Sequence, residues 1–230
     1  MAETQTFLYL TNRILKAFNE VKLDEDTFDT ADGFYEEAKD AVNQAIFDIY
    51  LEEDTSWPWA WREGEITTAV GTSLYTLSTE AVTVDWDSFM LQKDDAIDVT
   101  ADFLPSIEYK VWVSSGRKQI DLNSNTSSYS QPQQIVRRPD NKVLLTTVPD
   151  KIFTITYEYF TIPEPLVSFD DETVIPAAFI QLIVDKSLYY AYMFRDNVEQ
   201  AQLTQDRYER NVNRVRRIVI PQFQNLVAVV

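Results

Sequence analysis

The residues that could do chemistry in this sequence are mainly its carboxylates, because the chain contains no histidine and no cysteine. Their absence removes imidazole general bases, serine–histidine triads, thiolate nucleophiles, disulfides and the usual zinc ligands. Two groups of acidic residues have spacings that resemble metal sites. One lies in the region 24–33 and the other lies around residue 108.

The region 24–33 resembles a calcium loop, with Asp24, Glu25, Asp26, Asp29 and Asp32 close together. An EF-hand loop requires glycine at its sixth position. If Gly33 is that glycine, the first position is Phe28 and the twelfth is Lys39, and neither side chain ligates calcium. The motif fails. We therefore predict an acidic loop near a helix N-terminus, where carboxylates are favourable.

The second group is Glu108 and Lys110, preceded by Asp98 or Asp102, which resembles the aspartate and Glu-x-Lys of metal-dependent nucleases. Alternation along a strand would place Glu108 and Lys110 on one polar face, which explains them without a site. A nuclease also needs convergent ligands and a basic approach for DNA. A metal-dependent nuclease is kept as an alternative, and no cofactor or metal is expected.

The net charge of −17 is distributed unequally. Residues 1–60 carry 14 acidic and 4 basic residues, whereas residues 166–230 carry 8 acidic and 7 basic residues. Tight electrostatic binding of DNA requires clustered Lys and Arg facing phosphates, so it is not expected. A negative surface instead suits a protein past which DNA moves without sticking.

Four segments have helical periodicity: 5–22, 34 to about 54, a helix that starts with Pro176 after the cap Thr173, and a helix from about 196 to 218. Apolar residues cover nearly the whole circumference of the third helix, including Tyr189 and Tyr192. We expect such a helix to be buried between neighbours, including neighbours from another subunit.

The fourth helix has an apolar seam and a separate face formed by Arg207, Arg210, Arg214 and Arg217. Two interpretations of these arginines stay open. They contact acidic neighbouring subunits, or they form a solvated face that pairs with Glu199, Asp206 and Glu209.

Residues 62–165 predict antiparallel strands at 66–70, 74–77, 107–113, 143–147 and 152–160, with the longest loop at 123–134. In the last strand, Phe153, Ile155, Tyr157 and Tyr159 should face one way. Trp57, Trp59 and Trp61 could stack on a ligand, but we interpret them as packing at the junction before this region.

The predicted fold is therefore α+β. Residues 1–61 and 166–217 form a four-helix bundle, residues 62–165 form an inserted antiparallel β-sandwich or barrel-like lobe, and residues 218–230 form an extended arm. The sequence shows no signal peptide and no apolar run long enough to span a membrane.

The arm contains no charged residue, and a contiguous apolar segment of this kind is usually a binding surface. Pro221 restrains Ile220 toward extended geometry, so the helix should stop near Ile218. The residues expected to bind a partner are Ile218, Val219, Ile220, Pro221, Phe223, Leu226, Val227, Val229 and Val230.

Short motifs along most of the chain resemble those of the head-to-tail adaptor, or head-completion, proteins of tailed bacteriophages. They are Trp57-Pro-Trp59, Tyr75-Thr-Leu77, Val148-Pro-Asp150, Phe153-Thr-Ile-Thr-Tyr157, Asp170-Asp-Glu-Thr-Val-Ile-Pro176, Tyr189-Tyr-Ala-Tyr192 and the helix from Tyr208 to Arg217. The evidence is their order along the chain.

The resemblance implies a structural virion protein of the neck rather than an enzyme. Members of the family form rings, usually of twelve copies, whose C-terminal arms dock into the portal protein. Tail or nozzle proteins would bind below, genomic DNA would pass through the channel without tight binding, and no membrane would be involved. An acidic cytosolic binding module is the alternative from another class.

Overall fold

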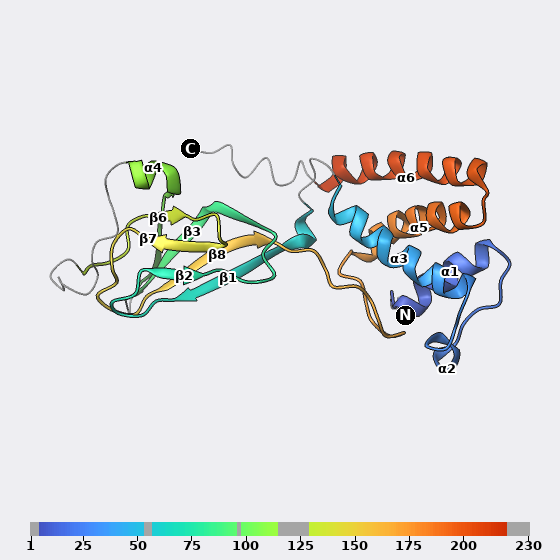
Figure 1. Cartoon of the computed structure of the whole chain (residues 1–230), viewed down its shortest axis with the longest axis horizontal. Helices are drawn as coiled ribbons and strands as arrows, with labels where there is room; N and C mark the ends of the chain where they lie inside the picture. The colour runs from blue at the N-terminus through green and yellow to red at the C-terminus, as the bar shows by residue number, and fades with distance from the viewer. Residues whose placement is uncertain (1–4, 53–56, 96–97, 115–128, 220–230) are drawn as a thin grey trace. The chain divides into compact units, whose positions relative to one another are not determined.

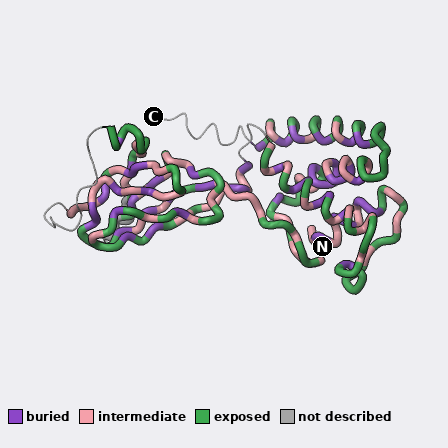
Figure 2. Tube along the Cα trace, viewed as in Figure 1, coloured by how far each residue is buried: buried purple, intermediate pink, exposed green. Residues whose placement is uncertain are grey.

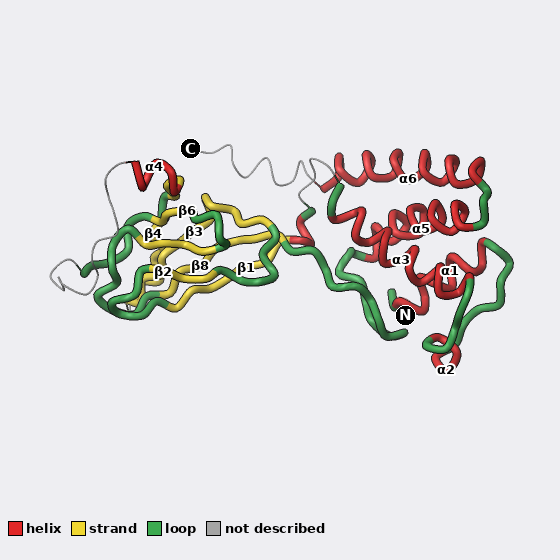
Figure 3. Tube along the Cα trace, in the orientation of Figure 1, coloured by secondary structure: helices red, strands yellow, loops and turns green. Residues whose placement is uncertain are grey.

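The computed structural model describes residues 5–52, 57–95, 98–114 and 129–219. It has a mixed α+β fold with two compact units (Figures 1 and 3). The helical unit combines residues up to Ala60 with residues from Ile162 onward, and the β unit is formed by Trp61–Thr161. The β unit is therefore inserted in the sequence of the helical unit.

The helical unit contains α1 (Phe7–Ala17), α2 (Glu25–Phe28), α3 (Phe34–Tyr50), α5 (Ile180–Phe194) and α6 (Val198–Val219), with short 3-10 turns at Pro58–Ala60 and Ala177–Phe179. Helix α5 is central, because it packs against α1, α3 and α6. The loops and the outer faces of the helices are exposed, and the facing sides are buried (Figure 2).

Helix α1 begins after Thr6, whose hydroxyl oxygen accepts a hydrogen bond from the amide of Tyr9. The predicted extension to residue 22 is wrong, because the helix ends at Ala17 and Asn19 adopts the left-handed conformation. Asn12 then holds the chain, since its side chain both donates to and accepts from the backbone of Leu23. Val21, which lies in the last turn of the predicted helix 5–22, is 76% exposed.

Helix α3 confirms its predicted start after Gly33, whose φ of +61° favours glycine. Its buried face includes Ala38, Val42, Ala45 and Ile49, as the spacing predicts.

Helix α5 differs from the prediction at both ends. Pro176 precedes a 3-10 turn rather than the first α-helical turn, and Thr173 accepts from the amide of Ile175 instead of capping the helix. At the other end Met193 and Phe194 are 44% and 54% exposed, so within this chain the helix is not buried all round.

Helix α6 buries Tyr208, Val212, Val215 and Val219 along the predicted seam, but Val198 is exposed. Ile218 and Val219 belong to this helix, so their assignment to the extended arm is wrong. The apolar contact made by Val219, which is only 8% exposed, accounts for the extra residues of helix. The remaining arm residues, Ile220–Val230, lie outside the described residues.

The β unit contains eight strands among its described residues: β1 (Trp61–Thr67), β2 (Leu74–Thr76), β3 (Thr83–Asp95), β4 (Asp98–Phe103), β5 (Ser106–Glu108), β6 (Ile135–Arg137), β7 (Lys142–Leu145) and β8 (Thr154–Phe160). They form two four-stranded sheets with the orders β1-β8-β3-β4 and β2-β7-β6-β5. Both sheets contribute to one apolar core, with Phe89, Leu91 and Ile155 from the first sheet and Val143 and Leu145 from the second.

Strand β8 confirms the predicted alternation, because Phe153 just before it and Ile155, Tyr157 and Tyr159 within it are buried. Gly64 lies opposite Tyr157 in the neighbouring strand. A Cβ atom at Gly64 would lie 2.7 Å from the hydroxyl oxygen of Tyr157, so glycine leaves room for this ring.

The predicted strand 107–113 is mostly wrong. Strand β5 ends at Glu108, and the short helix α4 (Tyr109–Ser114) follows and buries Trp112. Strand β5 pairs with β6 in parallel, which corrects the expectation of antiparallel strands throughout. Parallel neighbours need a long crossover connection, and α4 forms part of it. Residues 129–134 of the predicted loop are described, and the rest of 123–134 is not.

The three tryptophans that were predicted to have a packing role all contact other aromatic side chains. Trp57 is 1% exposed, stacks on Trp59, and donates a hydrogen bond from Nε1 to the carbonyl oxygen of Ile49 at 2.6 Å. Trp61 packs against Phe160.

A buried tyrosine links α6 to the end of α3. The Tyr208 hydroxyl donates to Oε2 of Glu52 at 2.9 Å, and Arg216 donates to the other oxygen of that carboxylate at 3.1 Å. Burial, and secondly the negative charge of Glu52, raise the pKa of Tyr208 above the ordinary tyrosine value of 10.0.

The raised pKa of Tyr208 predicts loss of stability at alkaline pH. Above pH 10 the unfolded chain ionises this tyrosine while the folded chain keeps it protonated, so the free energy of unfolding should fall with increasing pH by up to about 1.4 kcal/mol per pH unit for this group. Urea unfolding at pH 9, 10 and 11 should show a shallower decline for Tyr208→Phe than for the wild type. The control Tyr35→Phe should decline as the wild type does. Equal slopes for Tyr208→Phe and the wild type would contradict this account.

Candidate functional site: a basic groove on the helical unit

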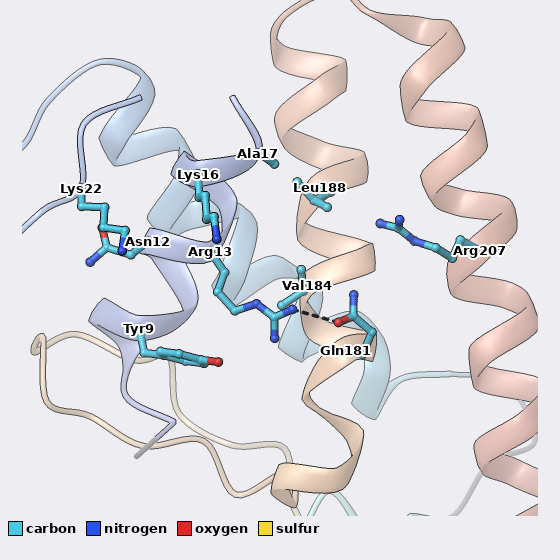
Figure 4. Close-up of a pocket in the computed structure, with 10 residues that line it drawn as sticks. All are labelled: Tyr9, Asn12, Arg13, Lys16, Ala17, Lys22, Gln181, Val184, Leu188 and Arg207. Carbon is cyan, nitrogen blue, oxygen red and sulfur yellow. Dashed lines mark hydrogen bonds between the residues drawn. The ribbon is translucent and has the colours of Figure 1, made fainter. Parts of the chain in front are cut away.

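A groove of about 660 Å³ lies on the helical unit beside α1, α5 and α6 (Figure 4). Its walls come from α1 and the chain just after it on one side and from α6 on the other, with α5 between them. The lining residues are Tyr9, Asn12, Arg13, Lys16, Ala17, Lys22, Gln181, Val184, Leu188 and Arg207. We call this site the basic groove.

The lining of the basic groove has four cationic side chains, Arg13, Lys16, Lys22 and Arg207, and no carboxylate. Residues 1–60 contain 14 acidic residues and only 4 basic residues, and three of these four basic residues line the groove. The cations are therefore concentrated at one place on an otherwise acidic helical region. Such a concentration attracts an anionic partner.

One face of helix α1 lines the groove, and another face packs into the core of the helical unit. Tyr9, Arg13 and Lys16 recur at intervals of four and three residues, which puts them on one face of the helix. Phe7, Leu10 and Ile14 form the buried face. The same helix therefore supplies core packing and the cationic wall.

A chain of polar contacts crosses the groove and joins α1, α5 and α6. Arg13 Nη2 donates to Gln181 Oε1 at 3.0 Å, as Figure 4 shows, and Gln181 Nε2 donates to Asp185 Oδ1 at 2.7 Å. Arg207 Nε lies 2.8 Å from the same carboxylate oxygen. We call the side chains of Arg13, Gln181, Asp185 and Arg207 the Asp185 bridge.

Asp185 is a fully buried carboxylate. Its side chain is 0% exposed, and Asn211 Nδ2 donates to its second oxygen, Oδ2, at 2.6 Å. A buried charge is tolerated only when it is paired and hydrogen-bonded, and these donors meet that requirement. The side chain of Arg207 is 47% exposed, so the carboxylate fixes Arg207 while part of this side chain stays open to solvent.

Lys16 and Lys22 are exposed, and among the described residues neither side chain has a hydrogen bond or an ion pair. Their ammonium groups are therefore available to an anion. Together with the Asp185 bridge, they provide hydrogen-bond donors suited to carboxylate or phosphate oxygens.

No constellation for catalysis is found in this groove, whose lining is cationic, amide, phenolic and apolar. In the ranges that the structure describes, there is also no group of three or more residues that could hold a metal ion. Asp24 caps α2, as its hydrogen bond to the amide of Thr27 shows, and Glu108 forms an ion pair with Arg137. Lys110 lies on α4, so the predicted shared strand face with Glu108 is wrong.

The predicted arginine face divides in the structure. Arg207 lies in the groove and pairs with Asp185, whereas Arg210, Arg214 and Arg217 are exposed on α6 outside its lining. The predicted pairing of this face with acids of its own helix is wrong for Arg207, because Asp185 comes from α5. Contact of the arginine face with other subunits stays a prediction.

The two predicted interface tyrosines pack within their own chain and are partly buried. The Tyr192 ring lies 4.6 Å from the ring of Phe18, and the Tyr189 ring packs edge-on against Tyr190. Their contact with another subunit stays a prediction.

The sequence alone did not predict Arg13, Lys16, Lys22, Gln181 or Asp185 as site residues. One signal was present: Asp185 and Lys186 are charged residues within the otherwise uncharged and mainly apolar helix Ile180–Phe194. A charged residue at a core position indicates a buried partner. The identity of that partner, 22 residues away on α6, required the fold.

The comparison with known families decides the class of protein. The model of the SU10 adaptor protein family matches residues 5–226. The chain belongs to this family. It is thus a structural adaptor of a bacteriophage, which confirms the coarse form of the resemblance seen in the sequence. No curated protein matches the chain. The described part of the adaptor has no helix both long and apolar enough to cross a membrane.

The Asp185 bridge predicts a large loss of stability when the carboxylate is removed. Asp185→Ala leaves the Arg207 and Asn211 donors without their acceptor, and we expect a loss of about 3 kcal/mol in the free energy of unfolding. Urea denaturation at neutral pH measures this change. The matched control Asp206→Ala removes an exposed carboxylate of α6 and should change the same quantity by less than about 0.5 kcal/mol. Equal effects of the two substitutions would contradict the bridge.

Proposed function

We propose that the adaptor is the subunit of a ring that binds beneath the portal and links the capsid to tail components. The observation that carries this proposal is the family match over residues 5–226, which includes both compact units and extends past the end of α6. A ring under the portal forms part of the channel through which DNA leaves the capsid. This places the protein in the neck of the virion.

The segment Ile220–Val230 is proposed as the portal-binding arm. Helix α6 includes Ile218 and Val219, so the proposed arm is taken as the residues that follow them in the sequence. The segment has no charged residue. Its apolar residues would fill pockets between portal subunits or pair with a strand edge there: Ile220, Pro221, Phe223, Leu226, Val227, Val229 and Val230.

We propose that the helical unit, as a four-helix bundle, makes most contacts between subunits. Met193 and Phe194 at the end of α5 are exposed apolar side chains, and Tyr189 and Tyr192 lie close by on the same helix. The β unit, as an inserted sandwich, has its core already filled by its two sheets and is placed at the periphery or lower rim. A count of twelve subunits is taken from the resemblance.

The charge of the adaptor supports passage of DNA without tight binding. The net charge is −17, and the arginines of α6 are balanced in part by carboxylates of the same chain, as Arg207 with Asp185 and Arg216 with Glu52. A channel wall of this sign does not retain phosphates. We place the exposed Arg210, Arg214 and Arg217 toward neighbouring subunits or the portal.

If residues 220–230 bind the portal, their deletion should reduce portal binding without unfolding the protein. Deletion of 220–230 keeps Val219 and the whole of α6, so the truncated protein should stay folded by circular dichroism. Its co-sedimentation with portal complexes of the same phage should fall at least about tenfold, because the apolar anchors of the arm are lost.

Two double variants separate apolar anchoring from chain length. Phe223→Ser with Leu226→Ser should weaken portal binding as the truncation does, whereas Gln222→Ser with Asn225→Ser should bind as the wild type does. Normal portal binding by the truncated protein would overturn the assignment of the arm.

A further inference from the structure

We propose that the basic groove binds the acidic segment 24–32 of a second copy of this chain. The proposal deepens the proposed function on which it rests, because it names the contact that would join neighbouring subunits of the ring. The partner is identified by charge complementarity between two exposed surfaces of the helical unit.

The acidic segment carries five carboxylates, all exposed: Asp24, Glu25, Asp26, Asp29 and Asp32. Among the described residues none of these five has an ion pair within its own chain. The groove has the opposite excess, four cations with no carboxylate in its lining. The acidic segment therefore has carboxylates without paired cations, and the groove lining has cations without carboxylates.

The acidic segment is held in a defined conformation before any partner binds. Phe28 is 1% exposed and packs its ring 5.1 Å from that of Phe7, and Lys39 Nζ donates to the carbonyl oxygen of Phe28 at 3.1 Å. Asn12 holds the backbone of Leu23 at the start of the segment. A preorganised segment loses little conformational entropy on binding, which favours its use as a contact.

The two surfaces adjoin at Asn12 but are formed by different charged residues. The acidic segment is anchored through Phe7 on the core face of α1 and through Asn12, whereas the cations that α1 gives to the groove are Arg13 and Lys16. A contact between unlike surfaces is heterologous, and it repeats from copy to copy until a ring closes. This is the contact type that a ring of identical subunits requires.

The volume of the groove and its fixed arginine side chain also suit the binding of carboxylates. A volume of about 660 Å³ accommodates a few side chains, and the arginine at its far wall is fixed by the buried Asp185. Charged contacts of this kind set the partner and the register of an interface. DNA is the competing anionic partner, and the experiment below distinguishes it.

The test uses charge reversal of each surface and a mixture of the two variants. The groove variant, Lys16→Glu with Lys22→Glu, has two cations and two carboxylates in the groove lining, so the positive excess of the groove is lost. The segment variant, Glu25→Lys with Asp26→Lys, has three carboxylates and two lysines in the segment, so most of its negative excess is lost. Each variant alone should self-associate at least about tenfold more weakly than the wild type, because the reversed side chains meet like charges on the next copy. In an equal mixture, the unchanged segment of the groove variant meets the unchanged groove of the segment variant, and the reversed side chains of the two variants meet opposite charges, so association should return.

Self-association is measured by analytical ultracentrifugation at low and high salt, for the protein alone and with portal complexes of the same phage. A matched control reverses acids outside the segment, Glu63→Lys with Glu65→Lys on β1, and it should associate as the wild type does. Wild-type association by both single-surface variants, or failure of their mixture to recover, would overturn the proposal.

Crosslinking adds a direct geometric readout, since the chain has no cysteine of its own. Lys16→Cys mixed with Asp26→Cys should form a disulfide between two chains at least about tenfold more than Lys16→Cys mixed with Glu158→Cys, because only the first pair meets at a proposed contact. Equal yields would count against the contact.

The outcomes separate this inference from the proposed function. If the wild type binds portal but the mixture of Lys16→Cys and Asp26→Cys gives no more disulfide than its control mixture, the groove contact is wrong and the adaptor function stands. If the crosslinked association forms but portal is not bound, the portal function is wrong and the groove contact stands. Unchanged self-association with loss of DNA affinity in the groove variant would assign the groove to phosphate and overturn the proposal.

Discussion

The buried carboxylate of Asp185 is the constraint on which the helical unit depends. A charge that is 0% exposed must be met by donors, and the structure supplies them from Gln181, Arg207 and Asn211. Because Gln181 also accepts from Arg13, three helices are held by one polar chain. Apolar contacts alone tolerate small slips between helices, whereas these hydrogen bonds are satisfied only when α1, α5 and α6 have one relative position.

The two contacts proposed for the adaptor, through the basic groove and through the arm, have different physical behaviour. The basic groove is electrostatic, so contacts made there weaken as salt screens them. The proposed arm is uncharged, so its contact with the portal would depend on apolar burial, which salt does not screen. A subunit with one contact of each kind can add neighbours through the groove and hold the portal through the arm, and the two steps respond differently to ionic strength.

The sequence predicted the elements whose periodicity is uninterrupted, such as α3 and β8, and the adaptor class. It failed where single side chains redirect the backbone, as Asn12 and Asn19 do at the end of α1. Strand β3 was missed because its pairing with β8 shifts register between Asp85 and Met90, and the polar residues there hide the alternation. The groove was missed because its cations come from α1, the following chain and α6, and periodicity within one helix cannot show which helices meet.

The central claim is that this adaptor assembles as a ring on the portal. Electron cryomicroscopy of portal complexes from the same phage, with and without the purified adaptor, tests it most directly. The account predicts an added ring of density under the portal, with the helices of one subunit against those of the next and the acidic segment 24–32 in the neighbouring groove. Portal particles that stay unchanged at saturating adaptor concentration, with the adaptor left as free monomers, would contradict it.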